Sequence, residues 1–377
     1  LLLFIIILKT NIIRKNFKKK SNLKIGVINN SNKNKENNLK KIKVMSYNIQ
    51  FASAIDKNNL LKGTKDMYWY DGGERISMNK DKSIKKFDDI INYIKKVNPD
   101  VIFLQEICKW SSRSGGYDQV EYLVNSLKNT DYINYCYASI HKVKFIPVLK
   151  LNKLDGKVDM GNMIISKYPI TNPIRHQLAI RKDTTRLQRF FDLKRNALTC
   201  DINLRKKNKI FLLNTHISAF SLDNTKKWQM NKIHNLVMQN ISKGKNVIFG
   251  GDLNTVPPGT LKTVGYPDSS HIDDFIIDET LSMDWIQTFI LDFESDYDID
   301  RYKSVRFNSD SNISEKKLSK LHEHEFGTHG IRGKYNRKVD YLFSNLKIKD
   351  YHKKDIGLIK KGWLSDHLPV IISYELN

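Results

Sequence analysis

Side chains that can bind a cation or transfer a proton follow six short apolar runs in this chain of 377 residues. Carboxylates, amides and imidazoles recur at these positions, where a rigid sheet presents reactive groups. Their types fit the hydrolysis of a phosphate ester assisted by a hard cation, because oxygen and nitrogen atoms can face a metal, a water or a phosphate. The six sites are Tyr47-Asn48, Gln105-Glu106, Asn214-Thr215-His216, Gly250-Gly251-Asp252-Leu253-Asn254, the run around Asp340, and Ser365-Asp366-His367.

The metal expected for this chemistry is Mg²⁺, with Mn²⁺ as a substitute. Mg²⁺ prefers octahedral oxygen ligands and is held by one or two carboxylates together with waters and the substrate phosphate. Glu106 is the best candidate ligand, because it follows the apolar run VIFLQ, where an unpaired carboxylate would be costly. A salt bridge to a nearby lysine is the alternative explanation. Asn48 and Asp366 are predicted to complete the metal shell, directly or through water.

The water that attacks phosphorus needs a base, and His367 is the candidate because imidazole titrates near neutral pH. Asp340 is the natural partner, since a carboxylate can fix the imidazole tautomer and stabilise its charged form. Asp366 would then face the metal, because adjacent residues in extended backbone point in opposite directions. We therefore predict a His367–Asp340 dyad beside a metal site.

Negative charge develops on the non-bridging oxygens in the transition state, where prearranged donors stabilise it. Asn254 and His216 are the predicted donors, and Asp252 is predicted to orient the water or to protonate the leaving oxygen. Taken alone, NTH also fits a core histidine, and GGDLN also fits a β-turn with an Asx cap. The presence of all six motifs in one chain favours the catalytic interpretation.

Strands and helices are interspersed around these motifs. The sequence SIKKFDDIINYIKKV at 83–97 places its apolar residues on one helical face and is closed by Pro99, and a second helix is predicted at 223–241. We predict a mixed α and β fold in which helices cover layered sheets, in one domain over 42–377, because no second linker divides the body. Strands are predicted at 41–50, 100–106, 133–140, 161–167, 196–204, 209–216, 246–252, 338–345 and 368–376.

Residues 1–41 differ from the body in composition. The first 43 residues carry 12 Lys and Arg against one acid, so +11 of the net charge of +24 lies there. The run LLLFIIIL is shorter than the roughly 20 apolar residues that span a bilayer. The Asn- and Lys-rich sequence at 21–40 is predicted to be a disordered linker. We interpret 1–41 as a membrane-seeking arm at the cytoplasmic face, with a secretory segment or a disordered tail as alternatives.

Two further features limit the possible functions. The block at 271–300 holds 10 Asp and Glu and no Lys or Arg, and is predicted to be a helical insertion near the site entrance. An acidic block of this size argues against a uniformly basic nucleic-acid surface. Its DFESDYDID stretch lacks the glycine of a calcium loop, so calcium binding is not predicted. The three cysteines are predicted to be buried thiols rather than a disulfide framework.

The motifs VMSYNIQ, DVIFLQE, GNMIISKYPI, LLNTHISAF, GGDLNTVPP, KVDYLF and LSDHLPVI, in this order, resemble those of the endonuclease/exonuclease/phosphatase superfamily. The resemblance covers about 42–377. It implies a four-layer αββα sandwich, in which two mixed β-sheets pack face to face between helical layers, and it implies Mg²⁺-dependent hydrolysis. It also implies the roles given above for Asn48, Glu106, His216, Asp252, Asn254, Asp340, Asp366 and His367.

The substrate class divides into two expectations within that superfamily. The SKYPI and GDLN sequences are similar to neutral sphingomyelinases, and a basic, apolar arm suits a lipid, so the first expectation is hydrolysis of a phospholipid headgroup at a membrane. The alternative is a nuclease, favoured by the net charge and by a basic run that also fits a solvated loop. A non-catalytic membrane-binding or nucleic-acid-binding scaffold is a distant alternative. The basic run consists of Arg175, Arg181, Lys182, Arg186, Arg189, Lys194 and Arg195.

Overall fold

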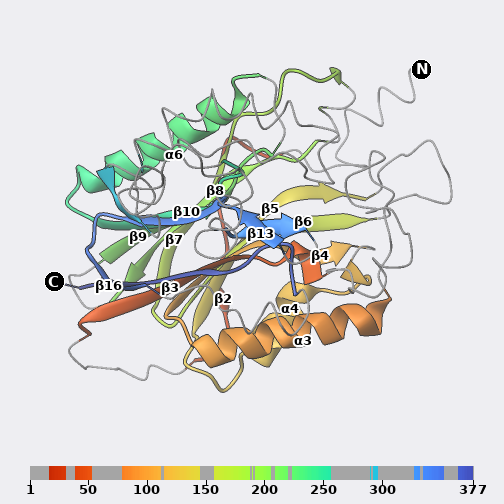
Figure 1. Cartoon of the computed structure of the whole chain (residues 1–377), viewed down its shortest axis with the longest axis horizontal. Coiled ribbons are helices and arrows are strands. Elements are labelled where there is room, and N and C mark those ends of the chain that lie inside the picture. Colours follow the sequence, from red (N-terminus) through yellow and green to blue (C-terminus); the bar gives the residue numbers. More distant parts are fainter. Residues whose placement is uncertain are drawn as a thin grey trace, which may run out of the picture.

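A computed structural model of the chain contains two seven-stranded sheets that pack face to face (Figure 1). No helix among the residues that it describes is long and apolar enough to cross a membrane. The described residues are 17–30, 39–52, 79–111, 114–144, 157–186, 189, 192–204, 209–219, 223–255, 289, 292–295, 327–331, 334–351 and 364–376.

The first sheet combines strands from both ends of the chain. β3 and β4 are parallel, and the other neighbouring pairs are antiparallel. The continuous apolar runs of β4 and β6 form strands that are buried on both faces. The strand order is β15 (Ile348–Tyr351), β16 (Val370–Glu375), β3 (Lys41–Asn48), β4 (Val101–Ser111), β6 (Val158–Ser166), β5 (Asn134–Val143) and β2 (Gly26–Val27).

The second sheet is also mixed, because β9 and β10 are parallel while their other neighbours are antiparallel. A separate ribbon of β12 (His329–Ile331) and β13 (Lys334–Arg337) precedes its strand β14. The strand order is β1 (Lys20–Asn22), β7 (Ile170–Gln177), β8 (Asn196–Asn203), β9 (Lys209–His216), β10 (Asn246–Asp252), β14 (Asp340–Ser344) and β11 (Glu294–Ser295).

Helices cover the outer faces of both sheets. α3 (Lys80–Val97) and α4 (Gln119–Ser126) pack on the first sheet, and α6 (Thr225–Ile241) lies over the second (Figure 1). The Asn79 side chain caps the first turn of α3, and Asn98 ends the helix in the left-handed conformation. The predicted four-layer αββα sandwich is therefore confirmed.

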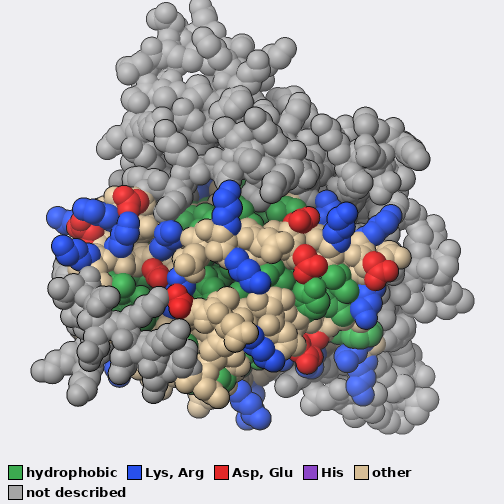
Figure 2. Space-filling model, turned by 90° about the horizontal axis from the view of Figure 1, so that it is seen from below, with side chains coloured by type: hydrophobic (Ala, Val, Ile, Leu, Met, Phe, Trp, Pro, Cys, Tyr) green, Lys and Arg blue, Asp and Glu red, His purple; other side chains and the backbone are tan. Residues whose placement is uncertain are grey.

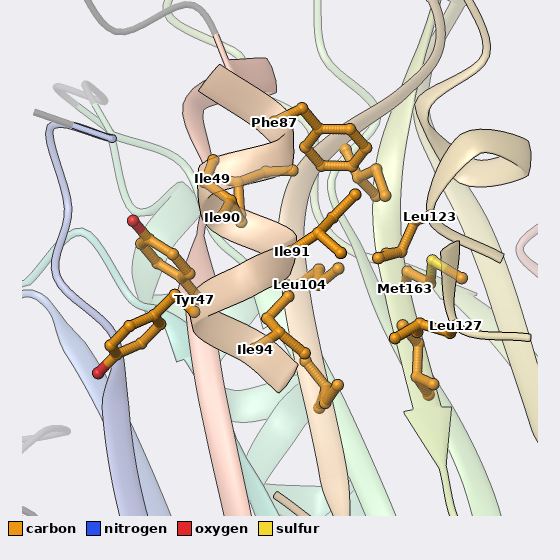
Figure 3. Packing of buried hydrophobic residues seen from close by; sticks show 14 of the residues in the cluster. Tyr47, Ile49, Phe87, Ile90, Ile91, Ile94, Leu104, Leu123, Leu127 and Met163 are labelled. Atoms are coloured by element: carbon orange, nitrogen blue, oxygen red, sulfur yellow. The ribbon is translucent and has the colours of Figure 1, made fainter. Parts of the chain in front are cut away.

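Separate apolar clusters fill the spaces between these layers. The inter-sheet cluster includes Val44, Phe103, Leu212 and Ile248, and all four side chains are fully buried. Figure 3 shows the cluster beneath α3, where Phe87, Ile90, Ile91 and Ile94 face Leu104 and Met163 of the sheet. Figure 2 shows the side of the molecule that carries α3, where basic and acidic side chains are interspersed. The three cysteines are buried and free, as predicted.

The N-terminal segment corrects one expectation. We expected a disordered linker at 21–40, with order beginning near residue 42, but β1 and β2 lie within it. β1 extends the edge of the second sheet beside β7, and β2 extends the edge of the first sheet beside β5. Asn29 then donates from Nδ2 to the carbonyl oxygens of Leu127, Thr130 and Tyr132. Backbone pairing, which composition does not report, orders β1 and β2, whereas residues 31–38 of the expected linker lie outside the described part of the chain.

Two other expectations fall largely on residues outside the described part of the chain. The apolar run at 1–8 lies there entirely. Of the acidic block at 271–300, the structure describes Phe289 and residues 292–295. Phe289 and Phe293 are buried against Phe249 beneath α6, and β11 pairs with β14, so this part of the block belongs to the second sheet and its core.

Replacement of Asn29 tests whether the N-terminal segment contributes to folding. Asn29→Ala removes the donor to three carbonyl oxygens and the acceptor for the Asn129 N–H. We expect the free energy of unfolding, measured by urea denaturation, to fall by about 1–3 kcal/mol. The control is Asn30→Ala, because Asn30 is exposed, and it should leave stability unchanged. Equal stability of the two variants would contradict the interpretation.

Candidate active site

Strand pairing brings three predicted residues side by side in the second sheet. Asp252 at the end of β10 pairs with His216 at the end of β9 and with Asp340 at the start of β14. In the first sheet, Asn48 at the end of β3 pairs with Gln105 within β4, next to Glu106. The site therefore occupies one end of the sandwich, which we call the catalytic end.

His367 and Asp340 form the predicted pair. Nδ1 of His367 lies 2.8 Å from Oδ2 of Asp340, and both side chains are buried. On the other side of the ring, Nε2 lies 3.7 Å from Oδ2 of Asp252 and 3.3 Å from Nδ2 of Asn48. Asn48 also donates from Nδ2 to Asp252 at 2.9 Å. One imidazole nitrogen is thus held by a carboxylate, and the other faces the centre of the site.

The carboxylates around His367 control its protonation. Burial alone would lower the pKa of His367, but the negative charges of Asp340, Asp252 and Asp366 raise it to about 10. In the metal-free protein the ring is therefore positively charged at neutral pH. Burial acts to raise the pKa of Asp366, but the charge of His367 and the contact with His329 hold that pKa below its ordinary value.

Glu106 lies at an irregular point of β4. Its φ is +59°, in the left-handed region, and the register between β4 and β6 shifts between Leu104 and Ile107. Such a bulge redirects a side chain and is common near active sites. Burial and, next, the nearby charge of Asp366 raise the pKa of Glu106 to about 7. A half-buried carboxylate near a second carboxylate is a favourable ligand for a divalent cation.

The predicted metal ligands Asn48 and Asp366 lie at the same end of the sandwich and are bridged by Gln50. Gln50 binds both Asn48 and Asp366: its N–H donates to Oδ1 of Asn48, and its Nε2 donates to Oδ2 of Asp366 at 3.0 Å. Among the described residues, two acidic and histidine groups are close enough to hold a cation, and each includes His367. They are His329 with Asp366 and His367, and Asp252 with Asp340 and His367.

The two predicted phosphate donors are already partly engaged. Nε2 of His216 lies 3.2 Å from Asp252, and its Nδ1 lies 3.8 Å from Oε1 of Glu106. Burial, followed by the charge of Arg195, holds the pKa of His216 well below its ordinary value, so the ring is neutral. Nδ2 of Asn254 donates to the carbonyl oxygen of Ile217, and its backbone N–H donates to Oδ1 of Asp252. Their role as donors to phosphate remains a prediction.

Several residues that the motifs did not indicate also contribute to the site. Nε2 of His329 lies 3.7 Å from Asp366, and its ring centroid lies 4.5 Å from that of His367. Oγ1 of Thr328 accepts a hydrogen bond from the backbone N–H of Asp340. Thr328 and His329 lie in the sequence FGTHG, shortly before the Asp340 motif. Their position next to that motif is the sequence feature that could have indicated their place in the site.

A buried glutamine fixes two strained segments of the first sheet. Gln50, Phe51 and Ala52 follow Asn48 with φ values of +44°, +41° and +52°, which are unfavourable for residues with a Cβ. Gln119 is fully buried, donates to the Phe51 carbonyl oxygen at 2.7 Å, and accepts from the N–H of Cys108 at 3.1 Å. It therefore joins the turn that carries Gln50 to the bulged part of β4.

Comparison with known proteins agrees with this geometry. The profile of the Endonuclease/Exonuclease/phosphatase family matches residues 45–367, which is most of the chain. The chain belongs to this family. Members are hydrolytic enzymes that cleave phosphate esters and generally use a divalent metal, so the expected enzyme class is confirmed. A search of curated proteins gives no match.

Solved structures resemble the chain at low sequence identity. The endonuclease/exonuclease/phosphatase from Beutenbergia cavernae is 15% identical, with a TM-score of 0.52, over 90% of this chain and 72% of that one. The human nocturnin catalytic domain with bound sulfate is 15% identical, with a TM-score of 0.47, over 89% and 94% of the two chains. An AP endonuclease from Archaeoglobus fulgidus is 13% identical, with a TM-score of 0.46, over 89% and 100%.

Replacement of Asp340 tests the electrostatics of this family member's histidine. Asp340→Asn removes the largest charge that raises the pKa of His367, so that pKa is expected to fall from about 10. An NMR titration of the imidazole signals in the metal-free protein measures the change. Asp350→Asn is the control, because Asp350 pairs with the exposed Lys41. An unchanged pKa in Asp340→Asn would show that the pair does not exist in solution.

Replacement of Gln119 tests the connection between the two strained segments. Gln119→Leu keeps the volume but leaves the Phe51 carbonyl and the Cys108 N–H without their partner. The free energy of unfolding should fall by about 1–3 kcal/mol, because buried polar groups become unsatisfied. Gln239→Leu on the exposed face of α6 is the control. Chemical denaturation that gives equal values for both variants would exclude this role for Gln119.

Proposed function

We propose that this enzyme hydrolyses phosphodiester bonds of nucleic acid with a divalent cation. The observation that carries the proposal is the meeting of His367, Asp340, Asp252 and Asn48 at the catalytic end, beside Glu106. A base with an oriented tautomer, a cation ligand and further carboxylates are the components that water attack on a phosphodiester requires. This function corresponds to the alternative expectation from the sequence.

Each of these side chains has a task in the proposed reaction. Asp340 holds Nδ1 of His367, which leaves Nε2 to accept a proton from the attacking water. Asp252 orients that water, or passes the proton that His367 has accepted on to the leaving oxygen. Glu106 and Asp366 would hold Mg²⁺ or Mn²⁺. When bound, the cation polarises the phosphoryl oxygen, and its charge favours the loss of the proton from His367.

Basic and aromatic side chains at the catalytic end support nucleic acid as the substrate. The N–H of Lys182 donates to Asp223, just before the first turn of α6, and Lys226 in that turn donates to the carbonyl oxygen of Asn254. In the same turn Trp228 is 39% exposed, and Nζ of Lys182 lies 4.4 Å from its ring centroid. Exposed rings and cations bind the bases and phosphates of a nucleic-acid strand.

One observation supports a phospholipid headgroup as a second candidate. β1 is antiparallel to β7, with Lys20 opposite His176, so the chain enters the fold at the catalytic end. The apolar run at 1–8 precedes this entry point in the sequence. An arm that binds the cytoplasmic face of a membrane would then hold the site near lipid headgroups. The solved structures that resemble this chain give the phospholipid candidate no support.

Parallel assays separate the two substrates. We expect the purified protein with Mg²⁺ or Mn²⁺ to cleave DNA or RNA oligonucleotides, and EDTA to abolish cleavage. His367→Ala should lower the rate by about 10²- to 10⁴-fold, because the general base is lost. His234→Ala on α6 is the matched control. Cleavage of sphingomyelin and phosphatidylserine vesicles alone would select the phospholipid candidate. If neither substrate is cleaved, both proposals are wrong, and the scaffold alternative gains support.

A further inference from the structure

Arg195 is a buried cation that the sequence motifs did not place in the site. It immediately precedes β8, and its side chain is 7% exposed. Nη1 of its guanidinium is buried without a hydrogen-bond partner. The Arg195 side chain forms neither a hydrogen bond nor an ion pair with any residue that the structure describes. Buried arginines are nearly always paired, so this one requires an explanation.

The position of Arg195 places it at the catalytic end. Ala197 of β8 pairs with Thr215 of β9, so Arg195 lies near the residues that follow Thr215, the first of which is His216. The carbonyl oxygen of Arg195 accepts the N–H of Leu178, which ties it to the chain that leaves β7. The sheet therefore holds the backbone at Arg195 beside the end of β9 that carries His216.

Electrostatics agrees with that location. Burial lowers the pKa of Arg195, whereas the negative charges of Glu106 and Asp252 act to raise it. Glu106 belongs to the first sheet and Asp252 to the second, so the guanidinium senses both halves of the site. Neither carboxylate forms an ion pair with Arg195 within 4 Å among the described contacts. Arg195 is thus close to the acidic centre but is not neutralised by it.

The charges of the site indicate what a free guanidinium can bind. Glu106, Asp252, Asp340 and Asp366 would repel a phosphodiester, which carries a negative charge of its own. A cation on the carboxylates offsets part of that repulsion. A planar guanidinium offers paired donors that match two oxygens of a phosphate group, and it is charged at neutral pH. The unused donors of Arg195 have this geometry.

We infer that Arg195 binds the non-bridging oxygens of the scissile phosphate, an inference that rests on the proposed phosphodiester hydrolysis. The phosphate oxygens of the substrate then accept the hydrogen bonds that the guanidinium of Arg195 does not make within the described part of the protein. The guanidinium then compensates the charge that develops on these oxygens as water attacks. Arg195 is accordingly a substrate-binding residue at the centre of the site, whereas the exposed Lys182 and Arg186 lie on the loop outside it.

A binding experiment tests this inference without catalysis. Inorganic phosphate is the probe, added to the metal-free protein in EDTA while the thermal midpoint of unfolding is recorded, since a ligand of the folded state raises that midpoint. We expect phosphate to raise the midpoint of the wild type and of Arg186→Met, an exposed arginine of the same basic run. The increase should be lost in Arg195→Met. An equal increase in Arg195→Met would overturn the inference.

Kinetics and chemical rescue provide the second measurement. With bis(p-nitrophenyl) phosphate as a generic phosphodiester, Arg195→Ala is expected to lose at least 10-fold in kcat/KM, and methylguanidinium in solution should restore part of it. Arg195→Lys keeps the charge without the paired donors, so it should fold and show an intermediate loss. Two results together would contradict phosphate binding by Arg195. They are a folded Arg195→Ala variant that loses all activity and is not rescued, and an Arg195→Lys variant with wild-type kinetics.

The two measurements distinguish failure of this inference from failure of the proposed function. If the wild type hydrolyses no phosphodiester but phosphate still protects it through Arg195, the anion site exists and the proposed function is wrong. If the wild type is active and phosphate protection is independent of Arg195, the inference is wrong and the proposed function stands.

Discussion

The hydrogen bond from Asn48 to Asp252 is the contact on which the site depends, because it joins the two sheets at the catalytic end. Asn48 ends β3 of the first sheet, and Asp252 ends β10 of the second. Neither sheet has a complete set of groups. The second sheet supplies His216, Asp252 and Asp340, whereas the first supplies Glu106 and Asn48. The packing of the inter-sheet core therefore sets the distances within the site.

Backbone strain is concentrated around the groups of the first sheet. Glu106 and the three residues after Ile49 have left-handed φ values without being glycine, whereas Gly250 and Gly251 provide such angles in the second sheet at no cost from a side chain. A Cβ at Gly250 or Gly251 would lie 2.0 Å from a neighbouring carbonyl oxygen, so these positions must be glycine for β10 to pair on both sides. The two sheets thus reach the same end by different means: β3 and β4 with strained residues held by Gln119, and β10 with two glycines, although Asn254 after β10 also has a left-handed φ of +43°.

The sequence predicted the parts of the fold that depend on local pattern. Continuous apolar runs identified β4, β6, β9 and β10, and the 83–97 periodicity identified most of α3. It did not predict β7, because ITNPIRHQ combines a proline with polar residues and pairs only through its neighbours β1 and β8. β1 and β2 are too short and too polar to give any periodic signal. Their order depends on partners that lie far away in the sequence.

The same distinction applies to the site. The His367–Asp340 contact could be predicted because each residue belongs to a recognisable motif and the chemistry requires their pairing. Arg195 and Gln119 could not, since their importance comes from burial and from the way the sheets pack. Arg195 belongs to a basic run whose sequence fits a solvated loop as well as a nucleic-acid-binding surface. Asn48 was predicted as a metal ligand, which stays a prediction, and its Nδ2 lies close to Asp252 and His367.

The two short N-terminal strands have a consequence for the integrity of the sheets in solution. β1 lies beyond β7 at one sheet edge, and β2 lies beyond β5 at an edge of the other. A body that began at residue 42, where the composition changes, would also expose Ile174–His176 of β7 and Asn134 and Tyr135 of β5, which now pair with β1 and β2. Exposed strand edges recruit strands from other molecules and lead to aggregation. The two short strands therefore shorten the open edge of each sheet.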